Sequence, residues 1–260
     1  MLQAVPEQRN FFDRKTALEQ PLVRSRLPCT DRPGRLDVTE YPIRADSDVK
    51  HAHFSLRASL AAFGTALALL ALPAALAAQQ DGAKGVVEAL HETLLEGMKR
   101  AEELKVSGRF TLFKPAIERR FNMRLMTAIA SGKHWRTASE DERRHLVDAF
   151  TRFSTGTYAA RFSSWSGESF EIVGRRPGPG STVIVDARIR RTGGDDPVAL
   201  SYVVRRFGDR WQIVDVLLDG GISELAVKRS EFSSILAGEG IDGLVKSLTA
   251  RTDAVLAKGA

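Results

Sequence analysis

The chain has 260 residues, of which 38 are Lys or Arg and 32 are Asp or Glu, giving a formal net charge of +6. Its arginines are dispersed, whereas a nucleic-acid-binding domain gathers its cations in a patch and carries a matching fold signature. We therefore expect no nucleic-acid partner. The only cysteine is Cys29, so no thiol is available beyond it.

An uncharged run, ASLAAFGTALALLALPAALAA, extends from Ala58 to Ala78. Basic residues precede it, and Ala75-Leu76-Ala77 is a small-residue cleavage pattern, so residues 50–77 are predicted to be a cleaved signal peptide. A transmembrane anchor is the alternative, since about 20 apolar residues span a bilayer. Pro73 interrupts the run and Ala and Gly dilute its hydrophobicity, which favours cleavage and export.

Residues 1–49 are rich in Pro, Arg and Asp and lack hydrophobic periodicity. Because a signal peptide belongs at the N-terminus, we interpret them as the product of a start codon assigned too far upstream; a disordered cytosolic extension is the alternative. The folded domain is predicted to be residues 78–260. That stretch has 28 Lys and Arg against 24 Asp and Glu, a net charge of +4, and is long enough for a sizeable core.

Three helices are predicted from apolar residues that recur at helical spacing. The first covers residues 86–104 and is expected to end at Gly108. The second covers residues 116–131, between a Lys-Pro pair and a glycine. The third begins at Ser139, where S-E-D-E is a capping-box pattern, and extends to about Trp165.

The hydrophobic period then changes to two, which predicts strands. Four strands are expected, over Ser169–Arg175, Ser181–Arg191, Val198–Phe207 and Arg210–Leu218. The short turns between them predict an antiparallel meander with one polar face. Two helices follow, over Ile222–Ala237 and Ile241–Ala257, separated by a Gly-Glu-Gly break.

Helices followed by an antiparallel sheet predict an α+β domain. The helices are expected to pack their apolar stripes on the apolar face of a curved four-stranded sheet. Such an arrangement can leave an apolar slot between the two layers, and we expect the functional site there.

Familiar catalytic and metal-binding patterns are missing from the sequence of residues 78–260. It contains no cysteine, no G-x-S-x-G and no glycine-rich phosphate-binding loop after a strand. His91, His134 and His145 do not stand in a metal-ligand pattern, and we interpret them as solvated surface residues. No metal and no cofactor is predicted.

Two aspartates, Asp215 and Asp219, stand at the end of the last predicted strand. Four residues apart, they would share a face with Trp211 and Ile213. An inward Asp215 could act as a general base with Tyr202 as its partner. We favour a scaffold role instead, in which Asp215 caps a helix or pairs with an arginine and Asp219 terminates the strand.

Several motifs together resemble the MlaC family of periplasmic lipid carriers. They include a W-x-x-x-D-V strand starting at Trp211, a G-x-x-S turn ending at Ser223 and an R-S-x-F helix segment ending at Phe232. Upstream, F-N-M-R-L-M at Phe121 and F-x-x-F at Phe150 also match. The sequence looks most like the branch of the family associated with hopanoid biosynthesis, HpnM.

The resemblance covers roughly residues 86–257 and implies an MlaC-like, NTF2-like fold. It also implies a monomeric periplasmic carrier, without catalysis, for a phospholipid or hopanoid. An inner-membrane MCE-type transporter complex and an outer-membrane lipoprotein are the expected partners. The alternative is an enzyme of the same fold that acts on a polycyclic lipid with Asp215 as general base. If residues 58–78 were never cleaved and served as a membrane anchor, the protein would instead be an anchored interaction module.

The resemblance also suggests which residues contact the lipid, since each exposed methylene of an acyl chain costs about 0.8 kcal/mol in water. The candidate slot residues are Phe121, Leu125, Phe150, Phe153, Tyr158, Tyr202, Val204, Val216, Leu218, Ile222, Phe232, Ile235 and Leu236. Arg229, then Lys228 and Arg124, are the candidates for a headgroup phosphate, because Arg offers paired planar donors. Each apolar residue could equally be ordinary core, and each cation a solvated or ion-paired side chain.

Overall fold

The computed structural model describes residues 72–193, 196–218 and 221–258. The chain divides into two units, residues 1–77 and 78–260, and the site lies in the second. The predicted extension and most of the predicted signal peptide lie outside the described residues, although residues 72–77 form the first turns of a helix. Within the described stretches, no helix is both long enough and apolar enough to cross a membrane.

The sheet consists of five antiparallel strands in the order β1-β2-β3-β4-β5. They are β1 (Ser169–Pro177), β2 (Thr182–Arg190), β3 (Val198–Phe207), β4 (Arg210–Leu218) and β5 (Ile222–Ser223). The predicted antiparallel meander of β1 to β4 is confirmed. The predicted total of four strands is wrong, because β5 is a fifth strand of the sheet. Gly221, at φ 127°, lets the chain reverse after β4 so that Ile222 pairs with Leu218. A two-residue strand is too short to show alternation, so Ile222 was expected to begin a helix.

Two strands contain an extra residue that interrupts the regular pairing. In β1 the register shifts between Ile172 and Gly174, which leaves Val173 as a bulge, 57% exposed. In β4 the register shifts at Val214, opposite the step from Val203 to Val204. Each bulge reverses the side-chain alternation of the residues that follow it.

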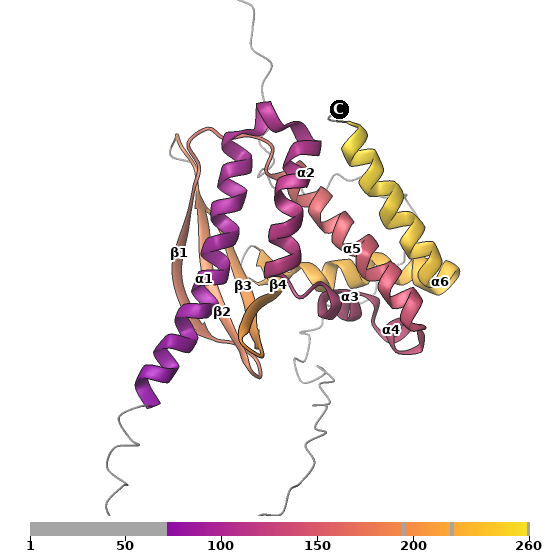
Figure 1. Cartoon of the computed structure of the whole chain (residues 1–260), viewed down its shortest axis with the longest axis horizontal. Helices are drawn as coiled ribbons and strands as arrows, with labels where there is room; N and C mark the ends of the chain where they lie inside the picture. The colour runs from indigo at the N-terminus through magenta and orange to yellow at the C-terminus, as the bar shows by residue number, and fades with distance from the viewer. Residues whose placement is uncertain (1–71, 194–195, 219–220, 259–260) are drawn as a thin grey trace, which may run out of the picture. The chain divides into compact units, whose positions relative to one another are not determined.

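Six helices occur in the described residues: α1 (Leu72–Lys99), α2 (Ala101–Arg120), α3 (Met123–Ser131), α4 (Lys133–Thr137), α5 (Glu140–Arg161) and α6 (Glu224–Ala257). In Figure 1, α1 crosses the sheet, and α5 and α6 lie beyond α2. The buried stripe of α1 contains Val87, Leu90 and Leu94. The helices therefore form one layer and the sheet the other, as predicted.

The first helix does not end where the sequence predicted. Gly108 lies inside α2, and the chain instead breaks after Lys99 and again at Lys105, whose φ is 53°. The buried Arg109 guanidinium donates to the Ala101 carbonyl at 2.8 Å and thereby satisfies an acceptor near the break. Pro115 also lies inside α2, on its exposed face, where a carbonyl without an N–H partner can bond to water.

The second predicted helix is divided at Phe121 and Asn122. The Asn122 N–H donates to the Ile213 carbonyl at 2.9 Å, so this short extended segment lies along β4. The Asn122 side chain then caps α3 by accepting from the Leu125 N–H at 2.9 Å. Further along, the predicted break in the last helix is confirmed: Gly240 has φ 65°, and Figure 1 shows the two halves of α6 running in different directions.

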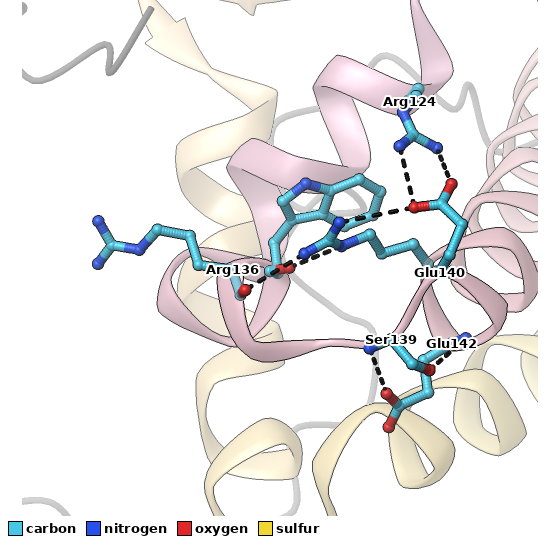
Figure 2. Close-up of polar contacts among 7 residues, drawn as sticks. Arg124, Arg136, Ser139, Glu140 and Glu142 are labelled. Atoms are coloured by element: carbon cyan, nitrogen blue, oxygen red, sulfur yellow. Dashed lines mark hydrogen bonds and ion pairs between the residues drawn. The ribbon is translucent and has the colours of Figure 1, made fainter. Parts of the chain in front are cut away.

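The capping box predicted at Ser139 is confirmed and begins α5. Ser139 Oγ accepts from the Glu142 N–H at 3.2 Å, and the Glu142 carboxylate accepts from the Ser139 N–H at 2.7 Å (Figure 2). The helix ends at Arg161, four residues before the predicted end at Trp165.

Substituting Ser139 with alanine should lower the free energy of unfolding by about 1 kcal/mol, because the α5 terminus loses one acceptor. Urea denaturation would measure the change. The control is Ser234→Ala, at an exposed position inside α6, which should leave stability nearly unchanged. Equal effects of the two substitutions would contradict a capping role for Ser139.

Candidate functional site

A cavity of about 40 Å³ lies between the helices and the sheet, where the slot was expected. Its walls come from the end of α2, from α3 and α5, from β4 and from the start of α6. Five predicted slot residues line it, namely Phe121, Phe150, Phe153, Tyr158 and Val216. The cavity therefore brings together residues that are up to 111 positions apart in the chain, from Ile117 to Lys228.

The most buried part of the cavity lining is apolar. Phe121, Phe150 and Val216 are buried there, and Ile117 and Leu225 complete this wall. The Phe121 ring meets the Tyr158 ring edge-on, with centroids 5.8 Å apart. Met123 and Met126 of α3 also line the space, and flexible thioether side chains adapt readily to irregular apolar shapes.

The more exposed part of the cavity lining carries charge. Arg161 of α5 forms an ion pair with Glu224 of α6, and the two side chains are 31% and 22% exposed. Lys228, one turn further along α6, is 22% exposed and donates to the Glu231 carboxylate at 2.9 Å. Its Nζ also lies 5.5 Å from the centre of the Phe153 ring. The cavity thus runs from an apolar interior to a charged mouth.

The surroundings of Arg161 and Tyr158 keep each side chain in one protonation state. Burial acts to lower the pKa of Arg161, but the Glu224 carboxylate outweighs it and the net shift is upward, so the guanidinium stays charged. Burial, assisted by Glu224, raises the pKa of Tyr158 well above its ordinary value, so the phenol stays neutral. The mouth therefore presents fixed charges beside a neutral aromatic wall.

The other candidate slot residues do not line this cavity. Tyr202 and Val204 are buried on the sheet, and Phe232 meets Phe150 edge-on at 6.0 Å. Ile222 is 57% exposed in β5. The remaining ones, none of which is exposed, are Leu125, Leu218, Ile235 and Leu236.

Sequence reasoning missed several residues of the cavity. Ser154, Thr157 and Arg161 share one face of α5 with Phe150, and Glu224 opens α6. The signal for the α5 residues was a helical stripe that becomes polar toward its C-terminal end. Only the aromatic residues of this stripe were predicted to line the slot, so its polar residues were missed.

Of the three cations proposed for a headgroup, the structure places only Lys228 at the cavity. Arg124 instead donates to Glu140 at 3.0 Å (Figure 2) and lies 5.4 Å from the centre of the Trp135 ring. Arg229 is exposed, and its Nε would lie 3.4 Å from a Cβ added at Gly132. Arg124 and Arg229 therefore belong to the surface around α3 and α4.

Asp215 points away from Tyr202, so the alternative interpretation, in which an inward Asp215 has Tyr202 as its partner, does not match the structure. The bulge at Val214 is the reason: Tyr202 pairs with Val216, whereas Asp215 pairs with Val203 on the opposite face. The carboxylate of Asp215 accepts from the Ser223 hydroxyl at 2.6 Å and from the Leu225 N–H at 3.3 Å.

These contacts give Asp215 a structural role, because they connect β4 to the start of α6. It also accepts from the Val216 N–H at 2.8 Å, and Ser223 in turn caps α6 by accepting from the Ala226 N–H at 3.0 Å. Burial raises the pKa of Asp215, although its three donors act in the opposite direction. Asp219, the second aspartate, lies outside the described residues.

His91 is buried, although the sequence predicted a surface residue. Its Nε2 lies 3.0 Å from the Tyr202 hydroxyl, and its ring stacks on Phe170 at 4.5 Å. Burial lowers the pKa of His91 to about 4. The prediction failed because His91 lies next to Leu90 on the sheet-facing side of α1, which a single polar residue does not reveal. In the described part of the chain, no group of three or more His, Cys, Asp or Glu is placed to hold a metal ion.

Comparison with known proteins places the domain in a family. Residues 88–250 match the family described as MlaC protein. The structure also resembles a phospholipid-binding protein from Ralstonia solanacearum, solved in complex with a phospholipid, with a TM-score of 0.59. Identity to that protein is 22%, over 67% of this chain and 98% of that one, which shows a shared fold. Because the family match covers more than half of the sequence, this chain belongs to the MlaC family.

Proposed function

We propose that this protein is a periplasmic lipid carrier that encloses the acyl chains of a phospholipid between its helices and sheet. The observation that supports this most is the cavity, whose apolar interior and charged mouth match the two ends of a phospholipid. Membership of the MlaC family and the phospholipid-binding neighbour point the same way. The position of Asp215 outside the cavity lining favours a carrier over an enzyme.

Delivery would follow the family pattern, between an inner-membrane MCE-type complex and an outer-membrane lipoprotein, after removal of residues 50–77. A hopanoid is the alternative cargo, suggested by the resemblance to HpnM. The charged mouth favours a phospholipid, because a polycyclic hydrocarbon offers no partner to Arg161 and Lys228.

Lipid uptake would require the walls to move apart. At about 40 Å³ the cavity holds one or two water molecules, whereas ligand pockets measure about 300–1,000 Å³. Met123 and Met126 belong to the adaptable wall. Asp215 and Ser223 fix the start of α6 to β4, so we infer that α3, and not α6, moves outward.

The test is to express the full chain in a Gram-negative host, purify the protein and record its native mass, then extract bound lipid. A stoichiometric adduct of phospholipid mass is expected, on a protein that begins at Ala78. An adduct of hopanoid mass would replace the proposed cargo, and protein without any adduct would contradict the carrier function.

A variant that fills the cavity should load at least tenfold less lipid. Ser154→Trp places an indole in the lining, where it competes with acyl chains for the same space. Asp148→Trp, at an exposed position of the same helix, is the matched control and should load normally. Circular dichroism would verify that both variants fold. Normal loading of a folded Ser154→Trp protein would show that the lipid binds elsewhere.

A further inference from the structure

The charged mouth of the cavity contains two cations and one carboxylate. Arg161, Glu224 and Lys228 line it, whereas Glu231, the partner of Lys228, does not. The lining itself therefore has one more cationic than anionic side chain. A phosphodiester carries one negative charge, so a single phospholipid headgroup would neutralise the lining.

Arg161 and Lys228 are held by ion pairs of different strength. The Arg161–Glu224 pair joins α5 to α6 and is partly buried, and removing one partner of such a pair leaves a costly uncompensated charge. Lys228 and Glu231 form an i,i+3 pair within α6, with side chains 22% and 41% exposed, so the Glu231 carboxylate is the more solvated of the two acceptors. Because water solvates such an exposed carboxylate almost as well as a lysine does, this pair exchanges easily. Lys228 can therefore leave Glu231 for a ligand, while Arg161 stays in place.

The position of Lys228 marks the boundary between the two ends of the cavity. Its Nζ lies 5.5 Å above the Phe153 ring, and Phe153 lines the cavity below it. A lipid whose chains contact Phe153 would carry its headgroup next to this ammonium. Arg161 reaches the same mouth from α5, so both sides of the mouth contribute positive charge.

We propose that Lys228 and Arg161 form a headgroup subsite for the phosphodiester of a phospholipid, with Lys228 as the direct ligand and Glu224 holding Arg161 in position. The subsite makes the carrier select phosphodiester lipids over uncharged lipids with the same acyl chains. This inference rests on the proposed carrier function and adds to it the pair of side chains that decides the cargo.

The test compares two probes with identical fluorescent acyl chains, a phosphatidylglycerol and a diacylglycerol, offered separately in phosphatidylcholine vesicles. Lipid bound to the protein is measured after the vesicles are removed. The wild-type protein should take up about tenfold more phosphatidylglycerol, since a charge-assisted hydrogen bond distinguishes the two probes. Lys228→Gln should reduce that ratio to nearly one, chiefly by lowering the uptake of phosphatidylglycerol.

Arg229→Gln is the matched control, because Arg229 is the next residue on α6, is exposed and does not line the cavity. It should keep the wild-type ratio. If Lys228→Gln and Arg229→Gln act equally, the preference reflects general surface charge and the subsite is refuted. The double variant Arg161→Gln/Glu224→Gln removes both members of the partly buried pair, so that no charge is left alone, and should also lower the ratio.

The possible outcomes separate the two proposals. Equal uptake of both probes by the wild-type protein would overturn the headgroup subsite and leave the carrier function intact. Uptake of neither probe, with no phosphatidylcholine bound to the protein either, would overturn the carrier function itself. A preference for diacylglycerol would overturn the subsite and indicate an uncharged cargo such as a hopanoid.

Discussion

Replacing Asp215 with alanine is expected to lower the free energy of unfolding by about 3 kcal/mol. The carboxylate accepts from Ser223, Val216 and Leu225, and these donors are buried or nearly so. Removing it leaves them without an acceptor and releases the start of α6 from β4. Urea denaturation monitored by circular dichroism would measure the loss.

Asp215→Asn separates a structural role from a catalytic one. The amide oxygen can replace one carboxylate oxygen, and the amide nitrogen can donate to the Ser223 hydroxyl, so the loss should be only about 1 kcal/mol. The folded variant should still bind lipid. If it retained lipid but lost a conversion of that lipid observed with the wild-type protein, Asp215 would be a general base after all.

Acidification should destabilise the protein through His91. Its pKa is about 4 in the folded state and about 6.5 in the unfolded chain, so only the unfolded chain binds this proton between those pH values. Stability from this source is present above pH 6.5 and falls as the pH drops toward 4. At pH 5 the loss should be about 2 kcal/mol, or 1.36 kcal/mol per pH unit below 6.5.

The measurement is the difference in unfolding free energy between pH 7 and pH 5, for the wild-type protein and for His91→Gln. Glutamine can still bond to the Tyr202 hydroxyl but does not titrate, so the difference should be about 2 kcal/mol smaller in the variant. Carboxylates elsewhere affect both proteins and cancel in the comparison. Identical pH dependence in the two proteins would show that His91 is not protonated on unfolding.

Features encoded by local sequence could be predicted. The four long strands, the capping box at Ser139 and the break at Gly240 follow from alternation, side-chain capping and positive φ, which depend on neighbours in the chain. Other features depend on distant contacts. Phe121 and Asn122 interrupt a helical pattern because β4 offers them a hydrogen bond at Ile213.

The residues of the site also divide into those that local sequence predicts and those that depend on distant contacts. The apolar wall was predictable from Phe121, Phe150 and Val216, because apolar stripes mark buried faces. The Arg161–Glu224 pair joins residues 63 positions apart, and neither residue stands out in sequence. The bulge at Val214 had a larger effect, because one extra residue turned Asp215 to the opposite face of the sheet.

The two edges of the sheet bear on how this protein behaves when crowded with copies of itself. An unprotected edge strand is a template on which another chain can add a strand and begin to aggregate. At one edge, β1 has a bulge at Val173 and ends in Pro177, and both hinder regular strand addition. At the other, Asn122 and β5 already take up bonding positions along β4. Both margins of the sheet are thus protected against strand exchange, even when the layers part in the proposed uptake of a lipid.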